Sequence, residues 1–255
     1  RSGAALREAF DQEGASARWI NALSPTRTCT TLLDTATGLV TELVENAGPA
    51  SDAEREAFLD EVERVSPFVT MAVLTGSLPA GTPSDFYARV IQRLRAPVVL
   101  DVRGPELLAA LPLRPLLVKP NRDELSHTLG RALDSRRDVL RAMRELLDRG
   151  AQSVLVTSGA AEILLARQGE PHLGVRWEPF PVDRLINSIG CGDCVAAGIA
   201  VRMAEGAPLP EAVAFGLAAA AENACDLFPA RPAREAVERR LAGFHSQPEP
   251  ITVSD

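Results

Sequence analysis

The sequence has few of the features that mark secreted, membrane-bound or nucleic-acid-binding proteins. Its four cysteines among 255 residues are too few for a disulfide scaffold, which favours a reducing compartment. No apolar run approaches the roughly 20 residues that a membrane span needs, and no signal-peptide pattern opens the chain. The 27 basic residues form no long runs and are outnumbered by 34 acidic ones, so we expect no nucleic-acid partner. These absences predict a soluble, cytoplasmic globular protein.

The composition nevertheless supports a large core, since 46% of the residues are hydrophobic and only 24% are charged. Short β-rich runs alternate with amphipathic helical stretches along the chain. No internal repeat and no long linker separates one part from another. We therefore predict one α/β domain over residues 1–255, with a doubly wound, mainly parallel sheet and helices on both faces.

Caps and turn signals place the individual elements of this domain. Ser51-Asp-Ala-Glu54 matches a capping box and opens a helix that reaches Val65. Two runs joined by a turn at Thr35–Gly38 predict a hairpin over residues 27–45, which we expect to form part of a lid. The remaining strands are expected within 68–76, 97–102, 116–119, 152–159, 162–168 and 172–177, and the other helices within 4–13, 83–94, 106–111, 123 onward, 135–149, 195–206, 210–227 and 233–244.

Ligands of doubly wound sheets bind beyond the carboxyl ends of the strands, where loops lead into helices. Four segments answer this description: GSLPAG (76–81), KPNRDE (119–124), TSGAAE (157–162) and NSIGCGDC (187–194). The chain has no G-x-x-x-x-G-K-[ST] motif, which excludes a P-loop. A dinucleotide fingerprint is also disfavoured, because Val195 stands where its third glycine belongs.

The segment NSIGCGDC combines glycines with a carboxylate at the start of a helix. Gly190 and Gly192 flank Cys191, and Asp193 falls in the first helical turn. Glycines let the backbone approach a ligand, and a helix N-terminus offers unpaired N–H donors and a partial positive charge. An adjacent carboxylate suits a general base beside a transferring phosphoryl group. The alternative is that Asp193 only caps the helix.

Cys191 and Cys194 form a C-x-x-C, which could indicate a metal site or a thiol-redox pair. A structural zinc would need two further ligands, and neither a second C-x-x-C nor the spacing of the histidines supplies them. Cysteines also serve as small, buried apolar residues. We favour this last interpretation.

Two further features are compatible with phosphate chemistry. Asn121 and Glu124 lie three residues apart at a helix start, where they could hold the water shell of Mg²⁺ or act only as a cap and a solvated acid. Arg27, between two threonines, is either an exposed strand charge or an anion contact. Spacing alone leaves both alternatives open.

Taken together, these segments resemble the ribokinase-like (PfkB) carbohydrate kinases, in particular the branch of phosphofructokinase and tagatose-phosphate kinase type. GSLPAG, VKPNRDEL, VTSGA and NSIGCGD occur in the order that the family has, each after a predicted strand. TRTCTTLLDTATGLVTELVE is similar to the strand–turn–strand segment of that branch. The resemblance implies ATP-dependent phosphorylation of a sugar or sugar-phosphate hydroxyl, with ATP and Mg²⁺ as cofactors. It is also compatible with a homodimer, because relatives often dimerise through the lid, but it leaves the oligomeric state open.

The resemblance assigns roles to the residues that match its motifs. Asp193 corresponds to the catalytic base, and Gly190, Cys191 and Gly192 correspond to the anion hole. By the same resemblance, Asn121 and Glu124 correspond to the pair that organises the ATP phosphates and, through indirect contact, Mg²⁺. The nucleotide is further bordered by Thr157, Ser158, Gly159 and Ser188, and the acceptor by Arg27 and Ser77.

The chain also departs from the family pattern. Cys191 replaces the usual alanine, and Glu162 stands where a second glycine of the nucleotide loop is usual. Nothing matches the family's first strand with its sugar-binding Asp, the Gly-Gly motif after it and part of the lid. We therefore expect this chain to be a piece of a longer kinase. The alternative is a catalytically inactive, truncated nucleotide-binding protein of the same fold.

Overall fold

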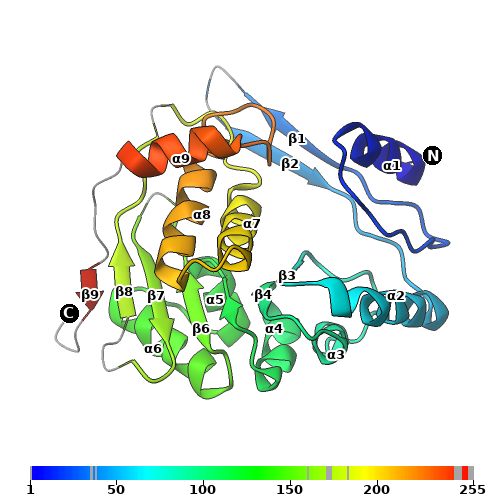
Figure 1. The fold of residues 1–255 in the computed structure, drawn as a ribbon, viewed down its shortest axis with the longest axis horizontal. Coiled ribbons are helices and arrows are strands. Elements are labelled where there is room, and N and C mark those ends of the chain that lie inside the picture. Colours follow the sequence, from blue (N-terminus) through cyan, green and yellow to red (C-terminus); the bar gives the residue numbers. More distant parts are fainter. Residues whose placement is uncertain are drawn as a thin grey trace.

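The computed structural model of the protein describes residues 2–34, 37, 39–159, 161–170, 174–182, 184–243 and 249–251. A seven-stranded sheet with the order β3-β4-β5-β6-β7-β8-β9 runs through its centre (Figure 1). The first four strands are parallel, and the last three join antiparallel. Their bounds are β3 (Ala72–Thr75), β4 (Val98–Asp101), β5 (Leu117–Val118), β6 (Ser153–Val156), β7 (Ile163–Arg167), β8 (Gly174–Trp177) and β9 (Glu249–Ile251).

Helices cover both faces of this sheet, as Figure 1 shows. One face carries α3 (Phe86–Arg93), α4 (Gly104–Ala110), α5 (Arg122–Leu129) and α6 (Arg136–Asp148), with the 3₁₀ turn η2 (Leu111–Leu113). The other face carries α7 (Cys191–Ala204), α8 (Leu209–Ala224) and α9 (Arg234–Gly243).

Successive strand residues alternate between the two resulting cores. Leu100 and Val154 are buried beneath the first group of helices, whereas Val99 and Leu155 are buried beneath the second. This alternation follows from the pleat of a strand, which points neighbouring side chains to opposite faces. The predicted doubly wound α/β fold is confirmed.

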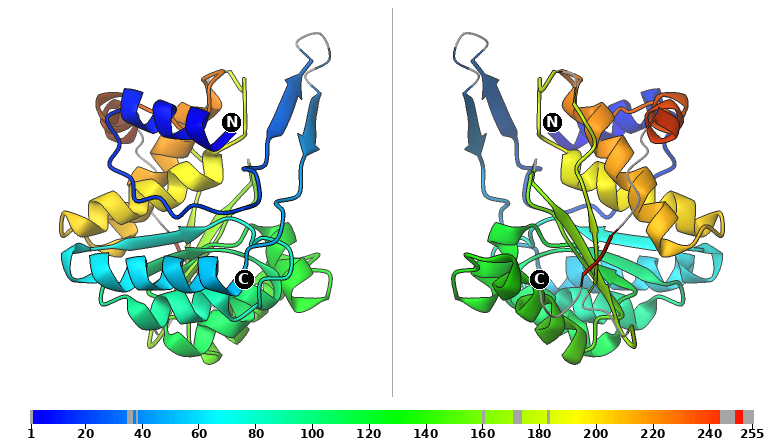
Figure 2. Two further views of the ribbon diagram at one scale, coloured as in Figure 1. Left: turned by 90° about the vertical axis from the view of Figure 1, so that its right-hand side faces the viewer. Right: turned by 90° about the vertical axis from the view of Figure 1, so that its left-hand side faces the viewer.

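The predicted hairpin forms a separate two-stranded sheet of β1 (Cys29–Leu33) and β2 (Val40–Val44). Its antiparallel register pairs Cys29 with Val44 and Leu33 with Val40. Figure 2 shows this ribbon projecting away from the body of the molecule. Most of the predicted turn between its strands, Thr35, Ala36 and Gly38, lies outside the described residues.

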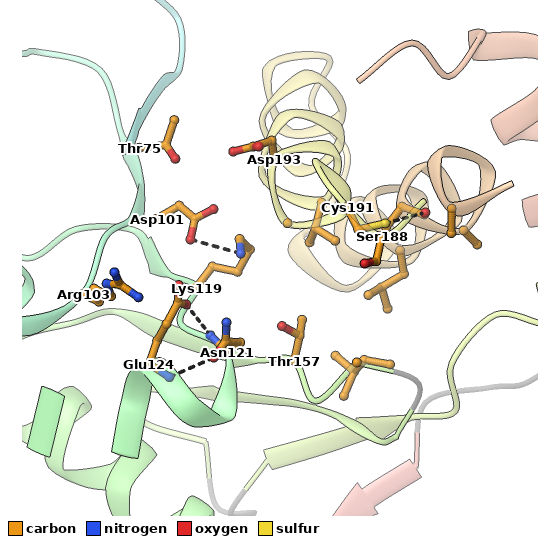
Figure 3. A pocket seen from close by; sticks show the side chains of 18 of the residues that line it. Thr75, Asp101, Arg103, Lys119, Asn121, Glu124, Thr157, Ser188, Cys191 and Asp193 are labelled. Atoms are coloured by element: carbon orange, nitrogen blue, oxygen red, sulfur yellow. Dashed lines mark hydrogen bonds and ion pairs between the residues drawn. The ribbon is translucent and has the colours of Figure 1, made fainter. Parts of the chain in front are cut away.

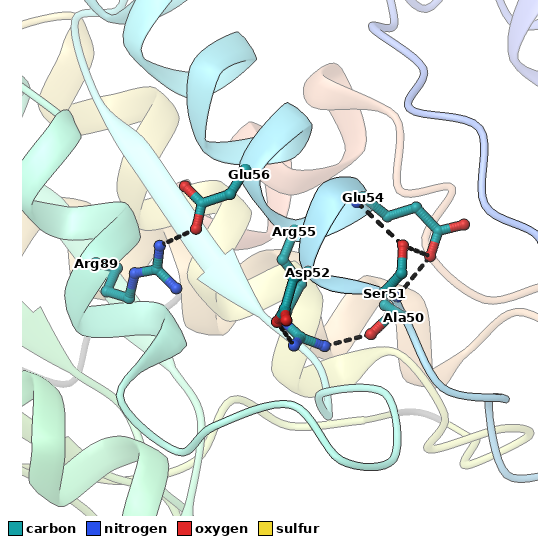
Figure 4. A network of polar contacts seen from close by, with 7 residues as sticks. All are labelled: Ala50, Ser51, Asp52, Glu54, Arg55, Glu56 and Arg89. Carbon is teal, nitrogen blue, oxygen red and sulfur yellow. Dashed lines mark hydrogen bonds and ion pairs between the residues drawn. The ribbon is translucent and has the colours of Figure 1, made fainter.

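A capping box starts α2 (Asp52–Val65), as the sequence predicts (Figure 4). Ser51 Oγ accepts a hydrogen bond from the Glu54 amide at 3.3 Å, and the Glu54 carboxylate accepts one from the Ser51 amide at 2.6 Å. These bonds lower the pKa of Glu54, the backbone bond from Ser51 most of all. Arg89 of α3 pairs with Glu56, which holds α2 beside α3. The chain before and after this helix adds α1 (Ser2–Gln12) and the 3₁₀ turn η1 (Ser66–Phe68).

Helices α7 and α8 approach each other unusually closely. A Cβ atom placed on Gly198 would lie 2.7 Å from Gly216 Cα, and one placed on Gly216 would lie 2.6 Å from the Val195 carbonyl oxygen. Only glycine fits at such a crossing, because any side chain would have to push the backbones apart. The position of α7, including its N-terminal turn, therefore depends on this contact.

Among the described residues, no helix combines the length and the apolar character that crossing a lipid bilayer requires.

Candidate active site

A cavity of about 1230 Å³ opens at the carboxyl ends of β3 to β6. Its walls come from the segments that follow these strands and from the N-terminus of α7 (Figure 3). Arg27, just before β1, and Glu42, in β2, also line it. A site for one small ligand commonly measures about 300–1,000 Å³. The cavity thus has room for two ligands side by side, at the edge of the sheet where α/β folds bind their substrates.

Two buried asparagines shape the turn that leads into α7. Asn187 donates to the Leu227 carbonyl at 3.0 Å and accepts from the Ile189 amide at 3.0 Å. Asn223 donates to the Ile189 carbonyl at 2.8 Å. Gly190 closes the turn at φ 77°, and a Cβ there would lie 3.2 Å from Pro229 Cβ. The left-handed conformation and this contact explain why the position carries glycine.

The amide groups at this helix start are not equally available to a ligand. The Cys191 amide donates to the Ser188 carbonyl at 3.3 Å, and the Cys194 amide donates to Gly190 at 2.9 Å. Within the described part of the chain, the amides of Gly192 and Asp193 have no acceptor. The amide donors left free at the start of α7 are therefore these two, whereas the resemblance implied an anion hole at Gly190, Cys191 and Gly192.

Asp193 projects from the first turn of α7 toward Thr75 and Asp101 across the cavity (Figure 3). Its side chain is exposed. No described residue hydrogen-bonds or ion-pairs with its carboxylate. Both oxygens can therefore accept a proton from a ligand, which a carboxylate bound up in capping could not do.

Asn121 and Glu124 lock each other at the start of α5. Asn121 Oδ1 accepts from the Glu124 amide at 2.8 Å, and Glu124 Oε2 accepts from the Asn121 amide at 2.9 Å. Two side-chain atoms of this pair take no part in these bonds: the second carboxylate oxygen of Glu124 and the side-chain amide nitrogen of Asn121. Only the oxygen can serve a cation, because the amide nitrogen is a hydrogen-bond donor. The described residues contain no cluster of three or more His, Cys, Asp or Glu side chains that could hold a metal. The remaining carboxylate oxygen suits contact with a hydrated Mg²⁺ through water.

The predicted nucleotide loop is only partly turned to the cavity. Thr157 and Gly159 line it, as does Ser188 from the segment before α7. Ser158 is not among the lining residues, and its carbonyl accepts from the Ala161 amide at 2.9 Å. Glu162, which replaces a family glycine, pairs with Arg136 of α6 at 2.8 Å. Its side chain is thereby drawn away from the loop.

On the opposite side of the cavity, Arg27 meets Ser77. The Arg27 guanidinium donates to Ser77 Oγ at 3.2 Å, and both side chains are exposed and line the cavity. The hydroxyl of Tyr87 donates to the carbonyls of Thr75 and Gly76, each at 3.0 Å, which fixes the loop that carries Ser77. The two residues assigned to the acceptor are thus in contact although they are 50 positions apart.

An ion pair that no sequence motif predicted lies in the cavity. Lys119 Nζ lies 3.1 Å from Asp101 Oδ1, and the lysine side chain is only 3% exposed. Burial raises the pKa of Asp101, and the nearby carboxylates of Glu124 and Asp193 add to this, while Lys119 opposes it. The sequence did contain a signal that could have indicated Lys119: it is the only lysine in the sequence, and it belongs to the motif VKPNRDEL.

The cysteine pair has the character of buried thiols. The Cys191 thiol donates to the Ala220 carbonyl at 3.4 Å, and burial raises its pKa. Burial likewise raises the pKa of Cys194 to about 11. Both groups stay protonated at neutral pH, whereas thiol-redox chemistry and zinc binding need the thiolate. These observations favour the apolar packing interpretation.

The fold and the cavity define a doubly wound α/β protein with a large cavity at the carboxyl ends of its parallel strands and the N-terminus of α7 in the cavity wall. A model of the pfkB family of carbohydrate kinases matches residues 1–227. The chain belongs to this family, which confirms the resemblance described above.

Individual relatives agree with this assignment. The 1-phosphofructokinase of Bacillus subtilis (strain 168) is 31% identical over 192 residues, which are 74% of this chain and 61% of that protein. Phosphofructokinase-2 from Escherichia coli, solved in complex with fructose-6-phosphate, has a TM-score of 0.80 at 26% identity, covering 94% of this chain and 78% of that one. A possible 1-phosphofructokinase from Thermotoga maritima has a TM-score of 0.87 at 19% identity, covering 99% and 80%, which shows the fold alone. The chain thus spans about three fifths of the length of this curated relative, 61%.

Proposed function

We propose that the protein uses ATP to phosphorylate a hydroxyl group of a sugar phosphate, as enzymes of the 1-phosphofructokinase and tagatose-6-phosphate kinase type do. One observation carries this proposal: a single cavity joins the free carboxylate of Asp193, the free amides of α7 and the Arg27–Ser77 pair. A base, an anion site and a second cationic subsite are the parts that phosphoryl transfer to a phosphorylated acceptor requires.

The acceptor would lie between the ribbon and the loop after β3. Arg27 can grip a phosphate group with two parallel hydrogen bonds, and Ser77 adds a hydroxyl donor. Both side chains are exposed in the cavity wall, and their only hydrogen bond among the described residues is to each other. A phosphate group would therefore have to replace only this one bond. This subsite is what distinguishes a sugar phosphate from an unphosphorylated sugar.

Asp193 would accept the proton of the acceptor hydroxyl as its oxygen bonds to the terminal phosphorus. The bond from that phosphorus to the ADP oxygen breaks in the same transfer. The amides of Gly192 and Asp193, together with the partial positive charge of the α7 N-terminus, stabilise the negative charge on the phosphoryl oxygens. Gly190 and Cys191 contribute by setting the turn in which these donors lie.

The nucleotide would occupy the half of the cavity next to α8. Leu217, Ala220 and Ala221 give this half an apolar wall suited to a purine base. Thr157, Gly159 and Ser188 border it, with Ser158 supporting the loop from behind. Asn121 and Glu124 face the region between the two halves, where the phosphate chain would run. Mg²⁺, when bound, would neutralise phosphate charge there, and Glu124 would hold it through water.

A cytoplasmic location is part of the proposal. Cys191 lies in the turn that binds the phosphoryl group and is a free thiol, as are Cys29, Cys194 and Cys225. A reducing compartment would keep the turn in this state.

The test is an ADP-release assay with Mg-ATP and a panel of acceptors: fructose 1-phosphate, fructose 6-phosphate, tagatose 6-phosphate and unphosphorylated fructose. Sustained, acceptor-dependent release with at least one sugar phosphate, and much less with fructose, is expected. Calorimetry in parallel measures Mg-ATP binding. Binding of Mg-ATP without ADP release on any acceptor would instead establish the catalytically inactive nucleotide-binding protein.

Replacing Arg27 with alanine should raise the KM for the sugar phosphate by about 10- to 100-fold, because one charge-assisted contact to a phosphate is lost. The KM for ATP should be nearly unchanged. Arg18→Ala is the control, since Arg18 is exposed and reaches only Glu61, at 3.8 Å. If Arg27→Ala raised the KM for ATP and not that for the acceptor, the two subsites would have to be exchanged.

We also propose that the ribbon joins two copies of the chain. The register puts Leu32 and Leu43 on one face of the ribbon, where they are 53% and 56% exposed, and puts the exposed Val40 and Val44 on the face of Glu42, which lines the cavity. An isolated two-stranded ribbon is marginally stable, so exposed apolar side chains on it indicate a partner. A tetrameric inhibited form of E. coli phosphofructokinase-2 has been solved, which makes self-association reasonable here.

Sedimentation velocity tests this association. The unaltered protein should sediment as a dimer, and Leu32→Lys with Leu43→Lys should sediment as a monomer with an unchanged far-UV spectrum. Leu227→Lys is the matched control, since Leu227 is likewise 53% exposed but lies in the segment after α8 and not on the ribbon. A monomeric unaltered protein would refute the proposed dimer.

A further inference from the structure

Two segments that lie apart in the sequence give the nucleotide half of the cavity its apolar wall. One is α8, which contributes Leu217, Ala220 and Ala221. The other is the segment 179–182, between β8 and the turn before α7, and all four of its residues line the cavity. Phe180 anchors this segment in the core beneath α7 and α8, since its side chain is only 6% exposed. A base bound here would contact both segments.

The segment 179–182 belongs to no helix or strand, and its backbone has few hydrogen-bond donors. Pro179 and Pro181 have no N–H group, so neither can donate a bond that would tie the segment to a neighbour. The carbonyl group of Pro181 makes a connection instead, because it accepts a hydrogen bond from Arg240 Nη1 at 2.6 Å. Arg240 lies in α9, 59 positions further along the chain. A side chain of α9 therefore holds part of the cavity wall.

The Arg240 guanidinium joins three parts of the molecule. Besides the Pro181 carbonyl, it bonds the Glu222 carboxylate of α8 from Nε at 2.7 Å and the Cys225 sulfur from Nη2 at 3.7 Å. The side chains of Arg240 and Glu222 are 14% and 23% exposed, so water screens this pair less than it screens a surface salt bridge. A planar guanidinium presents its donors in fixed directions, unlike an ammonium group. Arg240 thus sets one geometry for the segment 179–182 relative to α8.

Helix α9 itself stays outside the cavity. It lies beside α8 (Figure 1), and none of its described residues is in the cavity wall. Val237, which is 2% exposed, and Leu241 pack it against the core beneath α7 and α8. The family model matches residues 1–227, so α9 also lies outside the matched part of the chain. The link from Arg240 to the cavity wall is therefore an observation on this chain and not on the family.

We propose that Arg240 is a positioning residue for the nucleotide: it holds the segment 179–182 against α8 and so shapes the apolar wall that receives the base. The inference rests on the proposed function and extends it to α9. Arg240 does not line the cavity, so its effect is on nucleotide affinity and not on the transfer of the phosphoryl group. Coupling between two sites is reciprocal, so a bound nucleotide should in turn stabilise α9.

Amide hydrogen exchange on the unaltered protein tests this reciprocal effect. Saturating Mg-ATP should slow the exchange of α9 by about 5-fold or more, the lower end of typical coupling between sites. The sugar phosphate that supports ADP release should leave this exchange unchanged when it is added alone. Helix α2 is the control, because it packs on α3 and contributes nothing to the cavity wall. Exchange of α9 that ignores Mg-ATP, or that slows only as much as that of α2, would overturn the inference.

Variants of Arg240 supply the second readout. Arg240→Met keeps a long apolar side chain but removes every donor, and it should raise the KM and the calorimetric Kd for Mg-ATP about 10-fold. The kcat and the KM for the sugar phosphate should change by less than about 2-fold, a split that a general loss of structure would not produce. Arg240→Lys keeps a positive charge beside Glu222 and should recover part of the nucleotide affinity.

Arg234→Met is the matched control on the same helix. Arg234 pairs with Glu205 at 2.6 Å and with Glu238 at 2.9 Å, and neither acid lines the cavity. We expect this variant to keep its KM for Mg-ATP. If it raised that KM as much as Arg240→Met does, the effect would come from loosening α9 in general, and the specific role of Arg240 would be refuted.

The failure of this inference can be told from the failure of the proposed function. If calorimetry detects no binding of Mg-ATP to the unaltered protein and no acceptor releases ADP, the proposed function is wrong. If Mg-ATP binds but the exchange of α9 ignores it and Arg240→Met keeps its KM, only the role of Arg240 is wrong. Should Arg240→Met fail to fold, the exchange measurement on the unaltered protein still decides.

Discussion

Asp193→Asn is expected to lower kcat by about 10²- to 10⁴-fold, the usual contribution of a general base, while Mg-ATP binds with nearly unchanged affinity. Asparagine matches aspartate in size and keeps a helix-capping oxygen, but it cannot take up a proton at neutral pH. The carboxylate of Asp193 has no partner among the described residues, so the substitution breaks no hydrogen bond or ion pair of the fold. Stopped assays of ADP release and calorimetry of Mg-ATP binding measure the two quantities.

Asp123→Asn is the matched control for this experiment. Asp123 lies in the first turn of α5 as Asp193 lies in the first turn of α7, and it is also exposed. If removal of a negative charge near a helix N-terminus were the cause of the loss, both variants would lose activity similarly. We expect Asp123→Asn to keep its kcat. An Asp193→Asn protein that turned over as fast as the unaltered one on every accepted sugar would refute the assignment of the base.

Much of the fold follows from local signals in the sequence. Capping boxes at Ser51 and Asn121 mark helix starts that the structure confirms. The alternation of strands and helices is local too, and it suffices for a doubly wound sheet. The strand β9 was not predicted, because its three residues include a proline and are too few to show an alternation that a pattern can detect.

The site was only partly predictable, because it depends on contacts between distant segments. Motif order indicated Asp193 and the pair Asn121 and Glu124, which lie at helix starts. The partnership of Lys119 with Asp101 arises from the parallel pairing of β4 with β5, and no local spacing reveals it. Likewise, the Cys191 amide is occupied by Ser188 through a turn whose geometry the sequence pattern GCGD does not specify.

Gly198→Ala is expected to destabilise the protein by about 1–3 kcal/mol, the usual cost of overpacking a close contact. In an open helix the same change would stabilise by about 1 kcal/mol, because alanine is the better helix former. Here the added Cβ would lie 2.7 Å from Gly216 Cα and 3.2 Å from Gly216 N, both of them backbone atoms. Neither can yield as a flexible side chain would, so α7 and α8 must move apart. Urea denaturation followed by circular dichroism measures the free energy of unfolding.

Gly243→Ala is the control, because Gly243 ends α9 and a Cβ there would meet nothing within 4 Å. Its free energy of unfolding should stay within about 0.5 kcal/mol of the original, as surface changes usually do. A Gly198→Ala protein as stable as Gly243→Ala would show that the helices do not cross as closely as described.

The same substitution should reach the chemistry, because Gly198 lies on the helix whose first turn carries the amides of Gly192 and Asp193. A displacement of about 1 Å at a reacting group can cost on the order of 10² in rate. We therefore expect the folded fraction of Gly198→Ala to show a reduced kcat, with the KM for the acceptor little affected because Arg27 and Ser77 lie on other segments. Reduced stability with a full kcat would mean that α8 alone moves, and that α7 is held in place by the sheet beneath it.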